Sequence, residues 1–304
     1  MAKFNQPDPR NAGTWCWVNG LVKREDAKVS VLDSVVQGGD AVWEGLRISQ
    51  GRIYQLEEHL DRLLASAHAL LFEAIPGRDA VRQAVFDTLE ANSMSDGVHI
   101  RLTLTRGEKS TSGMDPRLNV HGCTLVVLPE YKGAVYGDGN LRLITSSVRR
   151  NGPSYLDSKI HHNNLLNNIL AKIQANHAGA DDAIMLDDRG FLAETNATNV
   201  FLIRDGVLCT PFGHACLPGI TRAYTLNLAV SLGIPIKEGD FSLTELYTAD
   251  EAFTTGTMGG LAHIAEVDGR RIGPVRRQGP GPMTVQLQQA YPNHIPSVPL
   301  PFIQ

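Results

Sequence analysis

The feature that most constrains this chain is an unbroken alternation of apolar and polar residues over Val98–Thr105. The apolar positions are Val98, Ile100, Leu102 and Leu104, and the polar positions are His99, Arg101, Thr103 and Thr105. A period of two predicts a β-strand with one buried face and one polar face. Such a strand needs partner strands and an apolar layer against its buried face, so the alternation excludes an all-helical fold.

Helical periods precede this strand. Leucine and alanine residues recur every three or four positions from Leu56 onward, which predicts an amphipathic helix there. A second helix is predicted over residues 79–91. Nearer the start, Asn19-Gly20 separates two short apolar runs and favours the tight turn of a β-hairpin over residues 15–22.

The later sequence also mixes strands and helices. Short strands are predicted over Leu141–Thr145, Asp182–Leu186, 199–203 and 207–210, with a hairpin at Asp268-Gly269. Helices are predicted over residues 160–177, 221–232 and 283–290. In the first of these helices, the apolar residues expected to face inward are Leu165, Leu166, Ile169, Leu170 and Ile173.

A stretch rich in glycine and tyrosine separates the two halves and has no helical periodicity. It follows an apolar strand predicted over residues 124–128, and we place a linker over residues 133–140. A chain of 304 residues exceeds a typical single domain. The pattern is mixed α/β, and we therefore expect two domains, one over residues 1–132 and one over residues 141–304.

Composition narrows the class of partners. The net charge of -4 is mild and the basic residues are scattered, so we expect no nucleic-acid partner. The first residues lack the apolar core of a secretory signal, and no run reaches membrane-spanning length, which predicts a cytoplasmic protein without a membrane partner. No CxxC pair occurs, so we expect reduced thiols and no metal site from Cys16, Cys123, Cys209 and Cys216.

Residue types alone leave the chemistry open. Lys159 lies in a polar stretch, where a lone lysine is most often a solvated surface charge. The run from Leu217 to Arg222 enters a predicted helix, and the unpaired N–H groups of a helix start form a ready phosphate site. A plain turn with a helix cap explains that run about equally well.

Longer blocks carry a family resemblance. The run Gly190-Phe-Leu-Ala-Glu194-Thr-Asn-Ala-Thr-Asn199-Val-Phe201 resembles the glutamate-containing signature of class IV aminotransferases. Further blocks occur in the order of that family, and together they cover most of residues 29–273. They are Val42-Trp-Glu-Gly-Leu-Arg47, Glu58-His-Leu-Asp-Arg62-Leu, Ser158-Lys159 before a Leu- and Asn-rich helix, the run from Leu217 to Arg222, and Phe253-Thr-Thr-Gly-Thr257.

The resemblance implies the two-domain fold of this family, in which the first domain is a smaller α/β domain and the second a larger one, with pyridoxal 5'-phosphate in the cleft between the domains, and a homodimer. Lys159 is similar to the family's Schiff-base lysine, which acts as a nucleophile only without its proton. Glu194 resembles the carboxylate that keeps the pyridine nitrogen protonated. For the phosphate, the resemblance implies the guanidinium of Arg62, the backbone N–H groups of Ile220 and Thr221, and the hydroxyl of Thr257; Leu217 would pack against the ring.

The same resemblance suggests residues on the substrate side. His99-Ile100-Arg101 is similar to a Tyr-Ile-Arg strand of branched-chain aminotransferases, and Arg101 would steer a substrate carboxylate. Arg47 matches another arginine of that site. Trp43 replaces the usual phenylalanine, where it would wall an apolar pocket or serve as an ordinary core residue. Met258, next to Thr257, completes the predicted substrate set.

Two departures leave the substrate open. Gly38 and Asn164 stand where the family usually has tyrosines, and the helix after Lys159 is closer to the D-amino-acid aminotransferase pattern. The sequence favours a transaminase that moves an amino group from an apolar, branched-chain type amino acid to 2-oxoglutarate or pyruvate. A D-amino acid or (R)-amine transaminase, or an aminodeoxychorismate-type lyase on the same fold, is the alternative.

Overall fold

The computed structural model describes residues 7–133, 135–136, 140–274, 277–293 and 295–303. Its contacts divide these residues into two compact units. The amino-terminal unit contains residues 7–133, Ile160–Asn164 and 296–303, and the carboxy-terminal unit contains the remaining described residues from 135 to 293 and residue 295. Two short segments beyond residue 141 thus pack with the amino-terminal unit, so one cut in the sequence does not separate the units.

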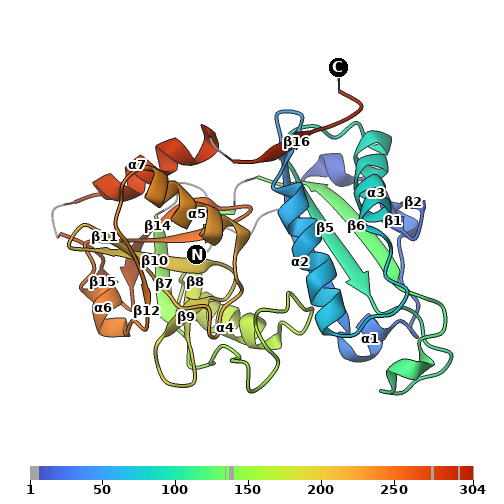
Figure 1. Cartoon of the computed structure of the whole chain (residues 1–304), viewed down its shortest axis with the longest axis horizontal. Helices are drawn as coiled ribbons and strands as arrows, with labels where there is room; N and C mark the ends of the chain where they lie inside the picture. Colours follow the sequence, from blue (N-terminus) through green and yellow to red (C-terminus); the bar gives the residue numbers. More distant parts are fainter. Residues whose placement is uncertain (1–6, 134, 137–139, 275–276, 294, 304) are drawn as a thin grey trace. The chain divides into compact units, whose positions relative to one another are not determined.

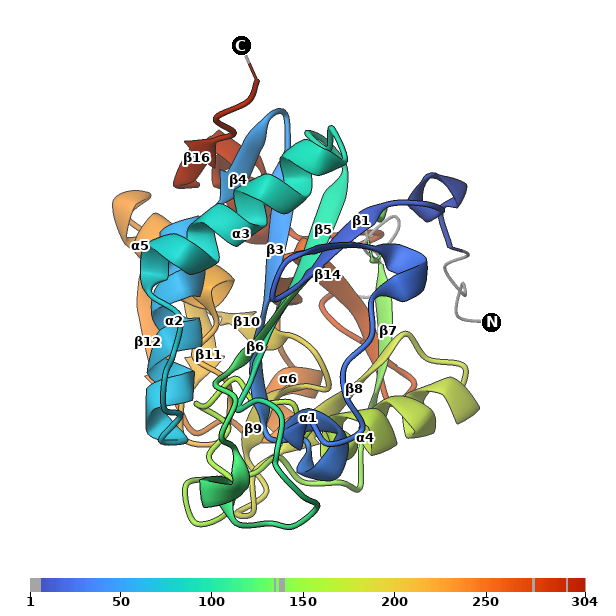
Figure 2. The ribbon, with the colours of Figure 1, turned by 90° about the vertical axis from the view of Figure 1, so that its right-hand side faces the viewer.

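The amino-terminal unit is built on an antiparallel sheet with the strand order β16-β4-β3-β5-β6-β1-β2 among the described residues. Its strands are β1 Trp15–Val18, β2 Leu21–Lys23, β3 Ala41–Ser49, β4 Arg52–Tyr54, β5 Val98–Thr105, β6 Thr124–Tyr131 and β16 Ser297–Pro299. Its helices are α1 Ser34–Gly38, α2 Leu56–Ala69 and α3 Arg78–Ala91, with 3-10 turns at Pro9–Asn11, Arg24–Asp26 and Pro116–Leu118. Figures 1 and 2 show α2 and α3 lying across the same face of the sheet.

The core of this unit lies between those two helices and the sheet. The apolar residues of β5 are fully or almost fully buried there, while its polar positions from His99 to Thr103 are half-buried on the opposite face. The alternating strand, the hairpin at Asn19-Gly20 and both predicted helices are confirmed. Strand β6 runs on to Tyr131 rather than ending at residue 128, because it pairs with β5 along its whole length.

The carboxy-terminal unit has a mixed sheet with the described order β12-β11-β10-β13-β14-β7-β8-β9, and β15 pairs with β14. Its strands are β7 Leu141–Thr145, β8 Asp182–Leu186, β9 Leu192–Thr195, β10 Asn199–Arg204, β11 Val207–Pro211, β12 Ile236–Gly239, β13 Glu251–Gly256, β14 Gly260–Val267 and β15 Arg270–Arg271. Its helices are α4 Leu166–His177, α5 Ile220–Ser231, α6 Leu243–Tyr247 and α7 Pro282–Ala290, with a 3-10 turn at Tyr291–Asn293. The strands, the hairpin at Asp268-Gly269 and the helices predicted near α5 and α7 are confirmed.

The prediction for the helix after Lys159 is wrong in two respects. Helix α4 begins at Leu166 rather than at residue 160, because the preceding segment bonds to β3 in the other unit. Its apolar residues do not face inward, since Leu166, Ile169, Leu170 and Ile173 are 71%, 52%, 49% and 42% exposed. Ala171 and Ala175 make the buried contact instead, because small side chains let the helix lie close against β8.

None of the helices in the described part of the chain has the length and apolar character needed to span a membrane. The predicted linker over residues 133–140 lies partly outside the described residues.

Candidate active site

Lys159 is the last residue of the carboxy-terminal unit before the segment that packs with the other unit. Its side chain is 45% exposed, and Nζ lies 3.4 Å from both carboxylate oxygens of Asp157. Asp157 also accepts the backbone N–H of Lys159 at 3.0 Å, a local turn that fixes the lysine backbone. Lys159 is therefore an accessible amine held beside one carboxylate.

Glu194 lies on β9 and is only 5% exposed. Arg150 Nε donates to its Oε1 at 2.5 Å, and Asn199 Nδ2 donates to its Oε2 at 3.1 Å. The backbone N–H of Leu217 also donates to Oε1, at 3.3 Å. A buried carboxylate needs such charged and polar donors, and these three fix Glu194 beside the start of α5.

Helix α5 begins directly after Gly219, where a larger residue would displace the side chain of Asn199. A Cβ atom on Gly219 would lie 2.0 Å from Asn199 Oδ1, and Gly219 offers no side chain to cap the helix. Asn199 Nδ2 donates to Leu217 O at 3.0 Å as well as to Glu194, so one asparagine joins the carboxylate to the helix start. The first N–H groups of α5, at Ile220 and Thr221, are then open to an anion.

The turn that carries Thr257 and Met258 follows the same strands. Thr255 pairs with Asn199 across β13 and β10, and its buried Oγ1 has no hydrogen-bond partner among the described residues. Thr257 and Met258 lie two and three residues further on, half-buried between β13 and β14. The carboxy-terminal unit thus brings Glu194, Leu217, the start of α5 and the Thr257 turn to one region. This donor set fits a phosphate ester attached to a ring with a basic nitrogen.

Arg62 belongs to the amino-terminal unit, on α2. Its Nε and Nη2 donate to Glu44 Oε1 and Oε2 at 2.8 and 2.7 Å, and its side chain is 14% exposed. The paired geometry fixes the plane of the guanidinium.

Apart from Met258, the predicted substrate residues lie on the polar face of the amino-terminal sheet. Arg47 pairs with His99 across β3 and β5, and Arg101 stacks on the ring of Trp43 at 3.4 Å. Arg101 Nη2 donates to Asn163 Oδ1 at 3.0 Å. Burial lowers the pKa of Arg101 to about 10 and the pKa of His99 to about 4. A partly desolvated guanidinium that stays charged at neutral pH attracts a carboxylate.

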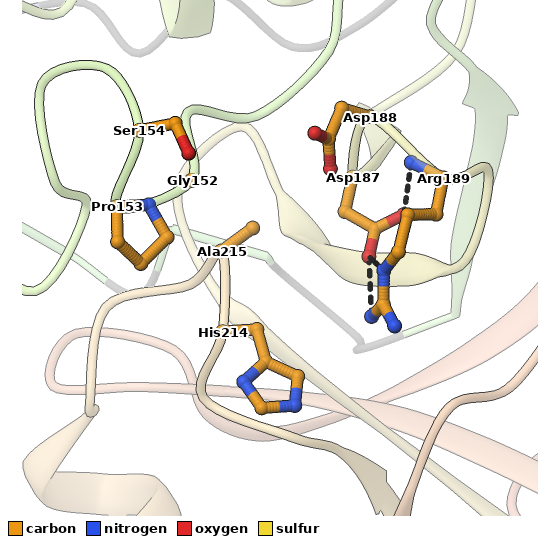
Figure 3. Close-up of a pocket in the computed structure, with 8 residues that line it drawn as sticks. All are labelled: Gly152, Pro153, Ser154, Asp187, Asp188, Arg189, His214 and Ala215. Atoms are coloured by element: carbon orange, nitrogen blue, oxygen red, sulfur yellow. Dashed lines mark hydrogen bonds and ion pairs between the residues drawn. The ribbon is translucent and has the colours of Figure 1, made fainter.

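A cavity of about 280 Å³ opens elsewhere in the carboxy-terminal unit. Figure 3 shows Asp187 held by Arg189 on one side of it and His214 on another, with Ser154 on the loop that leads toward Lys159. None of the predicted site residues lines this cavity. Within the described residues, no group of histidine, cysteine and acidic side chains is arranged to hold a metal ion.

Sequence reasoning missed several residues of these clusters. Arg150, Asn199, Glu44 and His161 were not singled out, although each contacts a predicted site residue or its partner. Asn199 stands in the same sequence block as Glu194, five residues further on. That short separation in the sequence was the available indication that the two side chains are in contact. For Arg150, Glu44 and His161, the spacing in the sequence does not indicate the contacts that they make.

Comparisons with known proteins show the family of this chain. A family model described as amino-transferase class IV matches residues 41–267. The chain is 56% identical to "Branched-chain-amino-acid aminotransferase-like protein 2" of Arabidopsis thaliana over 94% of its own length, which is 51% of the plant protein. It is 39% identical to a "Putative branched-chain-amino-acid aminotransferase" of Methanocaldococcus jannaschii, with 90% of this chain and 94% of that protein covered.

A solved structure is similar as well. The branched-chain amino acid aminotransferase from Escherichia coli has a TM-score of 0.83 and 30% identity, with 92% of this chain and 93% of that chain covered. The fold, the buried Glu194 beside the α5 start and the family match together define the class. The chain belongs to the class IV aminotransferases. It spans about half the length of the Arabidopsis relatives that it matches.

Proposed function

We propose that this chain is a pyridoxal 5'-phosphate-dependent aminotransferase that moves an amino group from an apolar, branched-chain type amino acid to a 2-oxo acid such as 2-oxoglutarate or pyruvate. The relatives and the solved structures named as branched-chain aminotransferases support the donor class. The family supports the cofactor, and similar structures contain it in phosphopyridoxyl or pyridoxamine form.

One observation carries the proposal. Asn199 donates both to the buried Glu194 and to Leu217 O, directly ahead of the uncapped start of α5. A carboxylate for the ring nitrogen and an N–H cluster for the phosphate are thus held by the same side chain. These are the two anchors that pyridoxal 5'-phosphate needs at opposite ends of its ring.

Different residues of the chain would bind the ring nitrogen and the phosphate of the cofactor. Glu194 would hold a proton on the ring nitrogen, and Ile220 and Thr221 would donate backbone N–H groups to the phosphate, with Thr257 and Arg62 as further donors. When bound, the cofactor supplies an electron-accepting ring that stabilises negative charge on the substrate carbon. Leu217 would pack against that ring.

Lys159 supplies the amine that holds the cofactor and moves the substrate proton. Asp157, 3.4 Å from Nζ, is the counter-ion of the protonated amine. Only the neutral amine is a nucleophile, so Lys159 must release this proton before it reacts.

Arg101 is the residue that would bind the substrate carboxylate, and Trp43 would pack against the side chain of the substrate. Arg101 stacks on Trp43 and is held by Asn163, so its guanidinium keeps a fixed plane for an incoming carboxylate. Arg47, His99 and Met258 complete the proposed substrate set.

A homodimer is part of the proposal, supported by α4. Its exposed residues Leu166, Ile169, Leu170 and Ile173 fall at positions i, i+3, i+4 and i+7, so they form one apolar stripe. A continuous exposed apolar surface marks a contact with another protein, and a second copy is the partner that is always present.

The stripe makes this part of the proposal testable. Replacing Leu166 with Lys is expected to shift the chain from dimer to monomer in analytical ultracentrifugation. Val230→Lys is the matched control, because Val230 is 61% exposed on α5, outside the stripe. Dimer formation by both variants would remove α4 from the interface.

A cytoplasmic location also remains a proposal. It is supported by the four cysteines, all of which are free and buried, as expected of a protein kept in a reducing compartment.

The decisive experiment for the function is a spectrum of the purified chain supplied with pyridoxal 5'-phosphate, before and after addition of L-leucine. The proposal predicts a cofactor band that converts to the pyridoxamine form, with release of the matching 2-oxo acid. D-alanine and an (R)-amine in separate samples test the alternative donors. Conversion by only one of those would replace the L-amino acid with that donor, and no bound cofactor at all would contradict the proposed activity.

A further inference from the structure

The segment directly after Lys159 forms an isolated antiparallel bridge with β3, at the edge of the amino-terminal sheet. Strand β4 pairs with β3 only at Ile48 and Ser49, which leaves the other end of β3 open on that edge. There the N–H of Trp43 donates to His161 O, and the N–H of Asn163 donates to Ala41 O, both at 2.9 Å. An antiparallel bridge joins Val42 to His162. Backbone bonds of this kind are those of an antiparallel edge strand.

Side chains reinforce the docking of this segment. Asn164 Nδ2 donates to Gly39 O at 3.1 Å, and the N–H of His161 donates to Ser66 Oγ at 3.1 Å. The five residues Ile160–Asn164 are therefore fixed on the amino-terminal unit by both ends. Lys159 is covalently attached to this fixed segment.

A buried carboxylate lies beneath the segment. Glu44 is 0% exposed, and each of its oxygens accepts two hydrogen bonds. Oε1 accepts from Arg62 Nε at 2.8 Å and from His161 Nδ1 at 3.0 Å. Oε2 accepts from Arg62 Nη2 and His59 Nδ1, both at 2.7 Å. A carboxylate has about four acceptor sites, so donors from the protein occupy all of them.

The protonation states follow from this geometry. Burial alone would raise the pKa of Glu44, but His161 and the guanidinium of Arg62, both hydrogen-bonded to it, hold that pKa well below its usual range. Burial lowers the pKa of His161 to about 4, so its imidazole is neutral at pH 7. An ionised carboxylate only accepts, and each histidine therefore carries its proton on Nδ1.

His161 also holds Trp43. The two rings lie 4.1 Å apart between centroids, tilted by 40°, and the backbone carbonyl of His161 accepts the N–H of Trp43. The indole Nε1 of Trp43 donates to the carbonyl of the next residue, His162, at 3.2 Å. His161 thus contacts Trp43 through its ring and Glu44, the partner of Arg62, through Nδ1.

We propose that His161 and Glu44 are positioning residues of the active site: Glu44 fixes the guanidinium of Arg62, and His161 ties the segment after Lys159 to that same carboxylate. The inference rests on the proposed function, which makes Arg62 the phosphate arginine and Lys159 the reactive amine. Loss of the His161 donor leaves Glu44 with an unfilled acceptor site. Arg62 then shifts to fill it, and its contact with the phosphate weakens.

The first test compares two substitutions that separate the ring of His161 from its donor. His161→Phe keeps a ring against Trp43 and removes the Nδ1 donor, whereas His161→Asn keeps a donor at the Nδ1 position and removes the ring. Cofactor-free protein is titrated with pyridoxal 5'-phosphate, and the dissociation constant is read from absorbance. His68→Phe is the control, because His68 is exposed on α2 and contacts neither Glu44 nor Trp43.

The proposal predicts a dissociation constant about tenfold higher for His161→Phe, a change that corresponds to about 1.4 kcal/mol of binding free energy. His161→Asn should stay within about threefold of the unmodified chain, close to His68→Phe. Unchanged binding by His161→Phe would overturn the proposal. Weakened binding by His161→Asn alone would overturn it too, since ring packing rather than the carboxylate would then be responsible.

A second test separates positioning from a general loss of structure. If His161 acts through Arg62, then the effect of His161→Phe on cofactor affinity disappears when Arg62 is already Ala, because neighbours in one network are not additive. Additive effects would contradict the proposal. Glu44→Gln should show the same dependence on Arg62, and it serves as the second variant if His161→Phe loses its native circular dichroism.

The two hypotheses fail in distinguishable ways. If the unmodified chain does not bind pyridoxal 5'-phosphate at all, the proposed function is wrong. If the unmodified chain binds it and His161→Phe binds it equally well, only the positioning role is wrong.

Discussion

Each unit of this molecule contains a buried glutamate paired with arginine, yet the two glutamates differ in what surrounds them. Glu44 receives side-chain donors alone, from Arg62, His59 and His161. Glu194 receives Arg150 and Asn199 and also a backbone N–H at Leu217, next to the start of α5. Glu44 thus orients other side chains, whereas Glu194 is built into the proposed ligand site itself. A buried ion pair alone does not tell these roles apart.

The largest expected effect lies at Lys159, outside both clusters. Replacing Lys159 with Ala should abolish transamination, because neither cluster offers another amine at that position. The fold should persist, since the lysine side chain is 45% exposed and fills no core space. Turnover assays with L-leucine and 2-oxoglutarate measure transamination, and circular dichroism measures whether the fold persists. Appreciable turnover by this variant would remove Lys159 from the mechanism.

A substitution at Glu194 tests the ligand-site half of the comparison. Glu194→Gln should lower kcat on the order of 100-fold, because a neutral amide no longer favours a proton on the ring nitrogen. Cofactor affinity should change little, since the phosphate donors remain in place. Steady-state kinetics and a cofactor titration separate the two quantities. An unchanged kcat would contradict the proposed role of Glu194 at the ring nitrogen.

For Glu44 we expect the main effect on folding stability. Glu44→Gln removes the charge that balances Arg62, and breaking a buried ion pair costs about 3–5 kcal/mol of folding stability. Urea unfolding measures this loss, and Glu57→Gln is the control, because Glu57 pairs with Arg78 and Arg82 at the surface of α2 and α3. Surface pairs contribute about 0–1 kcal/mol. Equal losses in both variants would show that Glu44 is not specially placed.

The contrast between Glu194 and Glu44 also explains why the sequence indicated one of these sites and not the other. Glu194 stands inside a continuous block, so a family resemblance found it together with the α5 start. The partners of Glu44 lie 15, 18 and 117 residues away, and only the pairing of residues 161–163 with the edge of β3 brings His161 to it. Nothing in the sequence indicates such an edge contact, because the segment has no strand period of its own.

Helix α4 shows a second limit of the sequence. Periodicity correctly placed four of its apolar residues, Leu166, Ile169, Leu170 and Ile173, on one face, but it wrongly predicted that this face points inward. Small residues on the other side, Ala171 and Ala175, pack on the sheet instead. The start of the helix was also predicted too early, since edge pairing outweighed helix propensity over residues 160–164.

The finest test of the comparison is the dependence of stability on pH. Burial lowers the pKa of His161 from 6.5 to about 4, so between these values the unfolded chain binds a proton that the folded chain does not. The free energy of unfolding is retained above pH 6.5 and falls as the pH is lowered toward 4, by at most about 1.4 kcal/mol per pH unit for this one group. His161→Asn should therefore flatten the pH dependence of urea unfolding, whereas His68→Asn, at an exposed position, should leave it unchanged. Identical slopes in all three proteins would mean that His161 titrates as it does in the unfolded chain, and the neutral Nδ1 donor to Glu44 would then lose its physical basis.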